Sequence, residues 1–245
     1  MSQQIGDASA PHVRVSREDE IQATLDNAGV GRGRVVVVLV GGASGMDEKD
    51  LDMLTVVLRE AVLPTLERYD AVVVDGGTDA GVMRLIGQAR AATGGQFPLV
   101  GVAAEGTVVV PGDGPTSADA APLEPNHTLF LLVPGTEWGD EAPWITQVAG
   151  VIAGSQPSVT LLVNGGQIAY TDVAGSLDSG RPVVVLAGSG RTADAIAEAR
   201  AGRGGDPRAV EIAASPLTMI ADIREAGAVA AAIDAALANP ERRPL

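Results

Sequence analysis

Residues 34–40 read RVVVVLV, a run of apolar side chains in which nothing polar follows Arg34. A strand with one face in water alternates apolar and polar residues, whereas a strand covered on both faces can be apolar throughout. The run therefore predicts a strand in the interior of a parallel sheet. A glycine-rich turn at 41–45 follows it, and a helical pattern then occupies residues 47–68.

The same order of apolar run, turn and helical pattern repeats along the chain. The runs lie at 34–40, 71–74, 97–104, 127–133, 158–163, 182–187 and 209–214, and the helical patterns at about 16–27, 47–68, 79–93, 141–153, 166–178, 191–201 and 216–238. This alternation predicts an α/β fold, with a mainly parallel sheet of about seven strands and helices on both faces. We expect one domain over 12–240 after a flexible tail at 1–11, with the irregular segment 105–126 as a lid or a surface excursion.

Composition excludes several classes of function. The chain has 245 residues, a formal net charge of −14 and no cysteine. This acidity disfavours nucleic acids and anionic membranes as partners, and the lack of cysteine excludes disulfides and thiolate metal sites. The N-terminal segment has no apolar core, so it does not resemble a signal peptide, and no apolar run is long enough for a membrane span. We expect a soluble cytoplasmic protein.

Five glycine-containing loops follow predicted strands, at 41–45, 75–78, 134–136, 164–166 and 188–192. The carboxyl ends of parallel strands meet at one edge of a sheet, where ligands bind. Glycine lets backbone N–H groups approach an anion, and the next helix N-terminus favours negative charge. Hydroxyl and guanidinium groups in the loops add donors, from Ser44, Thr78, Ser189, Thr192 and Arg191. The loops favour a phosphate-bearing ligand, although such turns also form for conformational reasons alone.

Other motifs are weaker. GSGRTA at 188–193 fits a dinucleotide fingerprint variant but lies late in the chain, and neither a P-loop nor a nucleophile elbow occurs. The two histidines, His12 and His127, do not form an obvious metal-binding pair. His127 starts a predicted strand, where it either serves as a capping or packing residue or contacts a polar ligand. Trp138 either stacks on a base or packs. Four acids either hold Mg²⁺ beside a diphosphate or are solvated, namely Glu105, Glu137, Asp140 and Glu141.

Four segments, in order, resemble those of the SLOG superfamily, specifically its LSDAT branch. They are VVVDGGTDAGVMRLIGQA at 72–89, FPLVGVAAEGTV at 97–108, LEPNHTLFLLV at 123–133 and PVVVLAGSGRTADAIAEA at 182–199, and VVVVLVGGASG fits the family's first strand and turn. Members of this branch occur alone in prokaryotes and at the cytoplasmic N-terminus of melastatin-type TRP (TRPM) channels.

The resemblance implies a Rossmann-like sheet that binds a nucleotide or a nucleotide-derived signal such as ADP-ribose. Carried onto this sequence, it places ligand contacts at Gly41, Gly42, Ala43, Ser44, Gly45, Gly76, Gly77, Thr78, Val82, Met83, Arg84, Asn126, His127, Gly188, Ser189, Gly190, Arg191 and Thr192.

The LOG branch of the superfamily contains hydrolases that release the base of nucleoside monophosphates, with a P-G-G-x-G-T-x-x-E motif. The segment here that resembles it, NGGQIAYTD at 164–172, keeps Gly165 and Gly166 but has Ile168, Ala169 and Asp172 where the family has glycine, threonine and glutamate. The motif is degenerate, so we expect Gly165 and Gly166 to preserve the turn after the strand, with or without a contact to a ligand.

Three functional hypotheses remain. The first is a module that binds or senses a nucleotide-derived small molecule and acts through self-association or a separate effector protein. The alternative is a hydrolase that cleaves an N-glycosidic or anhydride bond, with Asp172, Asp75 or Glu105 as acid or base. The third is a structural or partner-binding domain whose glycines only shape turns.

Overall fold

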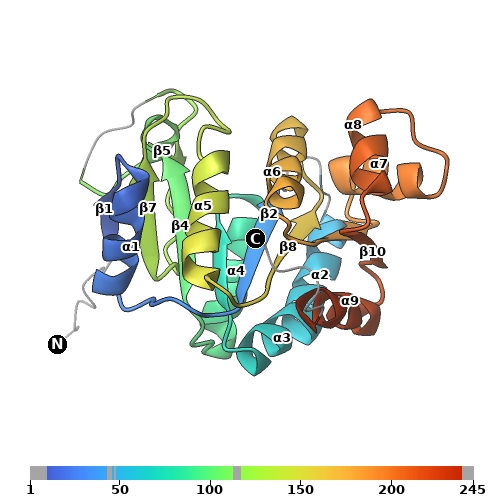
Figure 1. Cartoon of the computed structure of the whole chain (residues 1–245), viewed down its shortest axis with the longest axis horizontal. Helices are drawn as coiled ribbons and strands as arrows, with labels where there is room; N and C mark the ends of the chain where they lie inside the picture. Colours follow the sequence, from blue (N-terminus) through green and yellow to red (C-terminus); the bar gives the residue numbers. More distant parts are fainter. Residues whose placement is uncertain (1–9, 43–45, 47, 113–116, 239–245) are drawn as a thin grey trace.

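A computed structural model describes residues 10–42, 46, 48–112 and 117–238. The main sheet has eight strands in the order β1-β7-β4-β3-β2-β8-β9-β10, and every recorded pair in it is parallel. Figure 1 shows β1 and β10 at opposite ends of the molecule. The strands span His12–Arg14 (β1), Val36–Gly41 (β2), Val72–Asp75 (β3), Leu99–Ala104 (β4), Leu129–Val133 (β7), Ser158–Val163 (β8), Val183–Ala187 (β9) and Thr218–Asp222 (β10).

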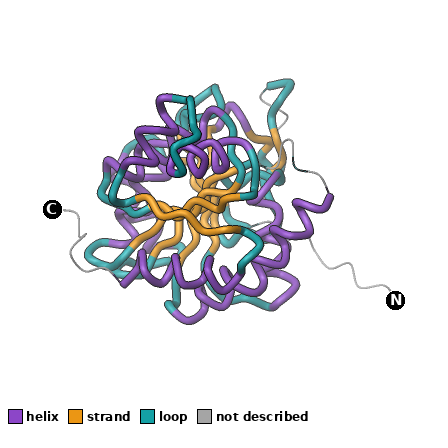
Figure 2. Tube along the Cα trace, turned by 90° about the vertical axis from the view of Figure 1, so that its right-hand side faces the viewer, coloured by secondary structure: helices purple, strands orange, loops and turns teal. Residues whose placement is uncertain are grey.

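Helices cover both faces of the sheet, as Figure 2 shows with the strands in the middle and helices above and below. One face packs against α1 (Glu18–Asn27), α5 (Ala142–Ala153), α6 (Gln167–Asp178), α7 (Arg191–Arg200) and α8 (Pro207–Ala214). The other packs against α2 (Glu48–Val57), the π-helical turn η1 (Leu58–Val62), α3 (Leu63–Arg68), α4 (Gly81–Thr93) and α9 (Ala226–Ala238).

Strand β2 explains why its sequence has no polar position. Val36, Val38 and Val40 belong to one core, while Val37 and Leu39 belong to the other. Successive side chains of a strand point to opposite faces, and both faces of β2 are covered. The prediction of an α/β, Rossmann-like fold is confirmed, with eight strands in the main sheet rather than about seven.

The strand order changes direction between β2 and β8. Chain order runs outward from β2 through β3 and β4 on one side, and from β8 through β9 and β10 on the other. This arrangement matches that of dinucleotide-binding folds, in which ligands bind in the crevice where the order reverses. Strands β7 and β1 extend the sheet beyond β4.

Two predictions near the C-terminus were wrong. Residues 209–214 belong to helix α8, and strand β10 together with the loop after it occupies the first part of the helix predicted at 216–238. Helix α8 begins where Asp206 accepts a hydrogen bond from the backbone N–H of Arg208, with Pro207 in the first turn. These capping signals, together with the burial of Ala209 and Ile212 on one face, favour a helix over a strand.

The long connection between β4 and β7 has structure of its own. It begins with the 3₁₀ turn η2 (Glu105–Thr107) and includes a small parallel ladder between β5 (Val108–Val109) and β6 (Ala121–Pro122). Val108 and Val110 pack with Leu132 in a small apolar cluster. Among the helices formed by the described residues, none is long and apolar enough to cross a membrane.

Candidate functional site

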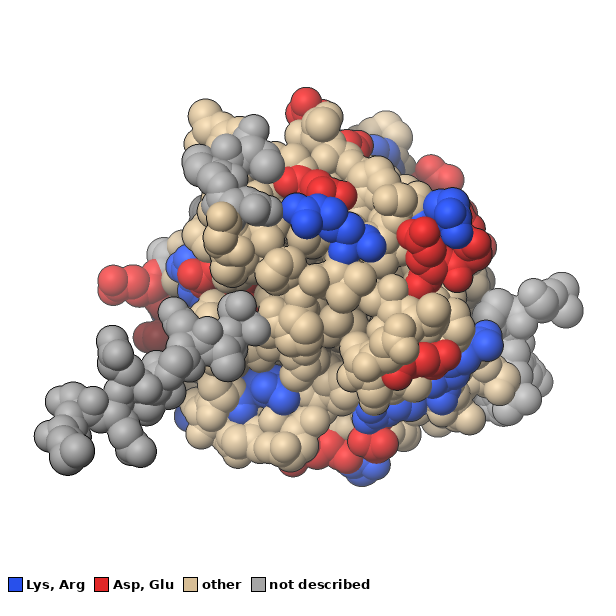
Figure 3. Space-filling model, turned by 90° about the vertical axis from the view of Figure 1, so that its left-hand side faces the viewer, with Lys and Arg blue, Asp and Glu red and all other residues tan. Residues whose placement is uncertain are grey.

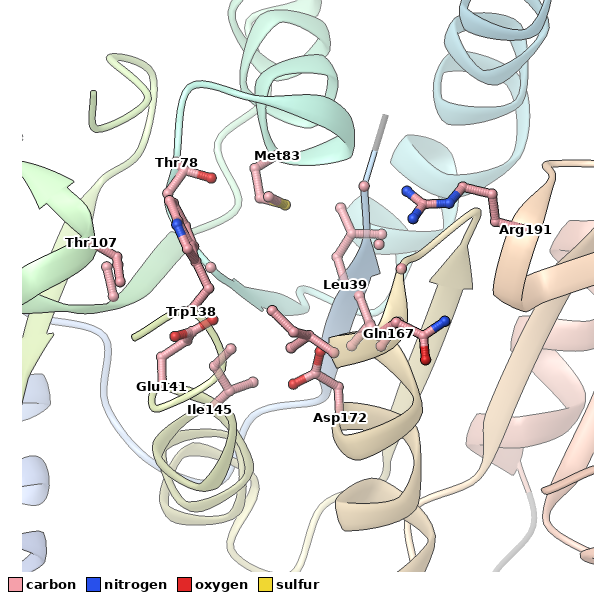
Figure 4. Close-up of a pocket in the computed structure, with 18 residues that line it drawn as sticks. Leu39, Thr78, Met83, Thr107, Trp138, Glu141, Ile145, Gln167, Asp172 and Arg191 are labelled. Atoms are coloured by element: carbon pink, nitrogen blue, oxygen red, sulfur yellow. The ribbon is translucent and has the colours of Figure 1, made fainter. Parts of the chain in front are cut away.

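A cavity of about 370 Å³ lies at the carboxyl ends of the central strands, at the point where the strand order reverses. The first, second and fourth of the five predicted glycine loops contribute Gly41, Gly42, Gly76 and Gly166 to its lining. Figure 4 shows side chains that line it, with Arg191 on one side and Trp138 on the other. The remaining lining residues are Leu39, Val40, Thr78, Met83, Ala103, Thr107, Glu141, Ile145, Gln167, Ile168, Ala169 and Asp172.

Gly41 allows the two central strands to run close together up to the cavity. It has a φ of +156°, and a Cβ atom built on it would lie 2.0 Å from the carbonyl oxygen of Val163 in β8. No side chain fits at that distance, so glycine is required for packing as well as for access. Ala43, Ser44 and Gly45, also predicted as ligand contacts, lie outside the described residues.

A buried histidine lies between two carboxylates behind the second loop. The Nε2 of His127 is 2.9 Å from Oδ1 of Asp75, and its Nδ1 is 2.8 Å from Oε2 of Glu124. Both ring nitrogens donate if both carboxylates are ionised, which makes the ring an imidazolium. Burial lowers the pKa of His127, but Asp75 and Glu124 outweigh it and raise the pKa to about 9.

The cluster of Asp75, Glu124 and His127 holds the second glycine loop, 75–78, through hydrogen bonds to its backbone. Oδ1 of Asp75 also accepts a hydrogen bond of 2.7 Å from the backbone N–H of Gly77, and the N–H of Glu124 donates to the Gly77 carbonyl at 3.0 Å. Asn126 donates to Glu124 through its backbone and its side chain. His127 and Asn126, both predicted as ligand contacts, therefore hold the loop in place and are not among the residues that line the cavity.

Close packing explains the second glycine of this loop. Gly77 has a φ of +67°, and a Cβ atom there would lie 2.9 Å from Cα of Gly101 and 3.0 Å from the ring of Phe130. The Phe130 ring in turn stacks on the imidazole of His127, with centroids 5.0 Å apart. Only the first glycine of the pair, Gly76, lines the cavity.

Of the three predicted contacts in α4, Met83 alone lines the cavity. Val82 is buried in the core on that side of the sheet. Arg84 forms an ion pair with Asp79, with 2.7 Å between Nε and Oδ1. Arg84 therefore neutralises the charge of Asp79, which lies in the loop before α4.

The fourth and fifth loops, 164–166 and 188–192, are tied together by side chains predicted to donate hydrogen bonds to a ligand. The Ser189 hydroxyl accepts a hydrogen bond of 2.7 Å from the N–H of Asn164 and donates to the Leu186 carbonyl at 2.6 Å. The Thr192 hydroxyl donates to the carbonyl of Gly166 at 2.9 Å. Ser189 and Thr192 are both buried, and neither lines the cavity.

The glycines of these loops shape the backbone. Gly188 and Gly190 have φ values of +85° and +99°, and the N–H of Gly188 donates to Oδ1 of Asp194 in the first turn of α7. Gly165 has a φ of +86°, and a Cβ there would lie 2.7 Å from that of Ala169. None of the three lines the cavity, whose lining includes Arg191 from the fifth loop and Gly166 from the fourth.

Arg191 and the N-terminus of α6 meet at one side of the cavity. A Cβ atom on Gly166, the residue before α6, would lie 3.2 Å from a guanidinium nitrogen of Arg191. The guanidinium thus lies against the helix end, where the dipole of a helix also favours negative charge. This side of the cavity is suited to an anion.

Two carboxylates line the cavity as well. Asp172 lies in the second turn of α6, where burial, and then the charge of Glu141, raises its pKa to about 7. The pKa of Glu141, just before α5, is also raised, mainly by burial. Glu141 accepts a hydrogen bond from the N–H of Gly139 at 3.0 Å. The pair places acids with elevated pKa inside the cavity.

The four acids considered for Mg²⁺ do not come together. Glu105 pairs with Arg14 at 2.9 Å, and Asp140 accepts the backbone N–H of Glu137 at 3.1 Å. Of the four, Glu141 alone lines the cavity. Across the described part of the chain, no group of three or more His, Cys, Asp or Glu side chains could hold a metal ion.

Sequence reasoning missed the apolar wall of the cavity. Leu39, Ile145 and Ile168 line it from β2, α5 and α6. Leu39 and Ile145 lie in apolar segments typical of a hydrophobic core, so periodicity could not distinguish cavity-lining residues from core residues there. Ile168 carried a signal, because it stands where the LOG motif has glycine.

Comparison with known proteins agrees with this fold. The family model described as "SLOG in TRPM, prokaryote" matches residues 34–232. The chain is 25% identical to transient receptor potential cation channel subfamily M member 2 of Mus musculus over 237 residues, covering 81% of the chain and 15% of the channel. For the Rattus norvegicus channel the identity is 25% over 240 residues, covering 82% of the chain and 16% of the channel.

The chain thus corresponds to a small part of these channels, whose activity belongs to much longer proteins. The family match includes every strand of the main sheet except β1, and every glycine loop that lines the cavity. The chain belongs to the prokaryotic SLOG family related to TRPM channels, the LSDAT group.

Proposed function

We propose that the protein binds a small anionic ligand derived from a nucleotide in the cavity between the two halves of the sheet. The observation that carries this proposal is the meeting of Arg191 with the N-terminus of α6, in a cavity also lined by Gly41, Gly42 and Gly76. A guanidinium, a helix end and accessible backbone are the groups that proteins use for phosphate.

The size of the cavity favours one nucleoside phosphate unit. Its volume of about 370 Å³ lies towards the lower end of the range of about 300–1,000 Å³ for small-molecule sites. A longer ligand such as ADP-ribose would place one nucleoside phosphate in the cavity and extend the remainder along the rim. AMP is therefore the first probe, and ADP-ribose, NAD and ATP test how much more is accommodated.

Thermal unfolding with added ligand tests the proposal. A ligand at about 100 times its Kd stabilises the folded state by about 2.7 kcal/mol, which raises Tm. Arg191→Gln should abolish most of the shift given by AMP. Arg84→Gln is the matched control, because Arg84 pairs with Asp79 and does not line the cavity. An unchanged Tm with every nucleotide at millimolar concentration would contradict the proposal.

A second candidate function is hydrolysis of the bound ligand. It is favoured by Asp172, whose pKa is raised to about 7 beside Glu141 within the cavity. A carboxyl with a near-neutral pKa can donate or accept a proton at physiological pH, as the cleavage of an N-glycosidic or anhydride bond requires. Prolonged incubation with AMP and ADP-ribose, followed by chromatography, separates the two functions. Products that form with the natural chain but not with Asp172→Asn establish hydrolysis, and an unchanged ligand excludes it for these probes.

A binding module needs an output, which we propose is self-association or a separate effector protein. Light scattering with and without AMP distinguishes these routes. A change in mass on addition of AMP supports self-association, and an unchanged mass favours an effector.

A further inference from the structure

Asp172 and Glu141 lie in the part of the cavity that Figure 4 shows below Arg191. Of the described residues that line the cavity, these three are ionisable. Asp172 belongs to α6, Glu141 immediately precedes α5, and Arg191 is the first residue of α7. With both acids ionised, the lining carries two negative charges and one positive charge.

An anionic ligand adds negative charge to this cavity. A phosphate monoester carries about two negative charges above neutral pH. Arg191 and the start of α6 attract the phosphate, but one guanidinium cannot also balance two carboxylates. Charges interact strongly where protein and ligand displace water, so ionised acids in the lining oppose binding. Uptake of one proton by a carboxylate removes part of this opposition.

The two carboxylates differ in how their ionised forms are stabilised. Glu141 accepts a hydrogen bond of 3.0 Å from the backbone N–H of Gly139. The side chain of Asp172 forms no hydrogen bond or ion pair with any described residue. Hydrogen bonds to a carboxylate favour its ionised form, whereas burial without them favours the protonated form. Asp172 is therefore the acid better suited to take up the proton.

The elements packed against α6 offer Asp172 little other charge. Helix α5 and strands β2, β8 and β9 contain no ionisable residue. Helix α8 contributes Arg208, which pairs with Asp206 at 2.8 Å and does not line the cavity. Asp194 of α7 accepts the backbone N–H of Gly188 and does not line it either. The charge balance in the described cavity lining therefore depends on Asp172, Glu141 and Arg191.

We propose that the ligand binds together with one proton, which the carboxylate of Asp172 takes up from solution. The neutral carboxyl group no longer repels the phosphate, and its O–H can donate a hydrogen bond to a ligand oxygen. Binding therefore weakens as the pH rises. The pKa of Asp172 without ligand, raised to about 7 by burial and then by the charge of Glu141, places this exchange near neutral pH. This inference rests on the proposed function and adds the control of the same site by pH.

A divalent cation between the carboxylates and the phosphate would be the alternative way to neutralise the cavity. In the part of the chain that the structure describes, no third His, Cys, Asp or Glu joins the two acids in a metal-binding group. This favours the proton over the cation. Titrations with EDTA and with Mg²⁺ separate the two possibilities.

Calorimetric titration with AMP measures the proton directly. The phosphate of AMP loses its second proton near about pH 6, so it is mainly a dianion from pH 7 upward. In EDTA at pH 8, buffers of different ionisation enthalpy should show that the natural chain takes up nearly one proton for each AMP bound. Its Kd should rise roughly 15-fold from pH 7 to pH 8.5, because the pKa of Asp172 without ligand is about 7.

Asp172→Asn has a neutral side chain of nearly the same shape at every pH. It should bind AMP without proton uptake, and its Kd should change less than about twofold over the same range. Asp178→Asn is the matched control on the same helix, because Asp178 does not line the cavity. It should behave like the natural chain. His127, with a pKa of about 9, is common to all three chains, so its titration affects them alike.

The outcomes separate this inference from the proposed function. AMP binding with a Kd independent of pH, or equal proton uptake by Asp172→Asn, would overturn the inference and leave the proposed function intact. Binding that occurs with Mg²⁺ and disappears in EDTA would also overturn it, because a cation would then neutralise the carboxylates. If AMP does not bind the natural chain under any of these conditions, the proposed function fails for this probe, and the inference fails with it.

Discussion

His127 illustrates how the environment of one residue changes its role. The imidazole is fully buried and lies within 3 Å of a carboxylate on each side, at 2.9 Å from Asp75 and 2.8 Å from Glu124. The charged group of Arg90 in α4 also acts on Glu124. A buried cation between two anions is stable only while all three partners are present. The sequence identified His127 but could not show that its partners are acids of the protein.

Replacing His127 with alanine should leave two buried carboxylates without their cation. We expect the free energy of unfolding to fall by about 3–5 kcal/mol at pH 7, measured with urea. The control is His12→Ala, in the edge strand β1, with an expected change within about 0.5 kcal/mol. Equal effects of the two substitutions would show that the His127 cluster contributes no special stability.

The contribution of His127 should also depend on pH. Its pKa is raised from 6.5 to about 9 on folding, so the charged form stabilises the native state. The stabilisation is complete below pH 6.5 and is lost as the pH rises through 9. The difference in stability between the natural chain and His127→Gln should therefore shrink from pH 6 to pH 10. A difference that stays constant would show that the ring is not charged at pH 7.

Ionisation of Asp172 has the opposite effect on the stability of the native state. Burial, then the charge of Glu141, raises its pKa from 3.8 to about 7, so ionised Asp172 destabilises the native state. The penalty is absent below pH 3.8, grows as the pH rises and is complete above pH 7. Asp172→Asn should thus increase the free energy of unfolding at pH 8 by roughly 2–4 kcal/mol, with little gain near pH 4. Urea unfolding at both values measures the effect, and a gain that does not vary with pH would refute this account.

At the scale of secondary structure, strand β2 and helix α6 define the site. Strand β2 ends at Gly41 beside Val163 of β8, and α6 begins at Gln167, where Arg191 lies against the preceding Gly166. The apolar run and the glycine turn predicted both elements. Residues 209–214 were predicted as a strand because their apolar residues resemble one. The capping residue Asp206 was the signal that favoured helix α8 instead.

Gly41→Ala should disturb the contact between β2 and β8. The new Cβ would lie 2.0 Å from a backbone oxygen that cannot move without separating the strands. We expect a loss of more than about 3 kcal/mol in urea unfolding. Gly180→Ala is the matched control, since Gly180 has a φ of +74° but no atom within 4 Å of the added methyl group. It should cost only about 1 kcal/mol. Similar losses would mean that backbone strain, rather than the close approach, makes Gly41 necessary.

At the scale of the whole molecule, acidic and basic side chains lie beside one another on the face that carries β1 and α1, as Figure 3 shows. The cavity lies in the middle of the sheet, where the strand order reverses. Exposed pairs such as Arg17 with Asp19 contribute little to stability. The cavity instead joins segments from both halves of the sheet, with β2 and α4 from one half and α6 and α7 from the other.

A ligand in this cavity should protect both halves of the sheet at once. We expect AMP to slow amide hydrogen exchange around Gly76 and Met83 and around Gly166 and Asp172, because all four residues line the same cavity. Helix α8 does not line it and should show little change. Protection confined to one half would contradict binding at the strand reversal.

The sequence by itself determined the fold class and the segments that carry glycine turns. Hydrophobic runs without polar positions can be buried only between two layers of helices, and this constraint acts locally along the chain. Only the tertiary structure decided which groups face the cavity. Gly76 lines it while Gly77 packs on Phe130, and Arg191 lines it while Ser189 and Thr192 tie two loops together. These neighbouring residues have similar local sequence signals, and their roles diverge because their contacts come from strands and loops far away in the sequence.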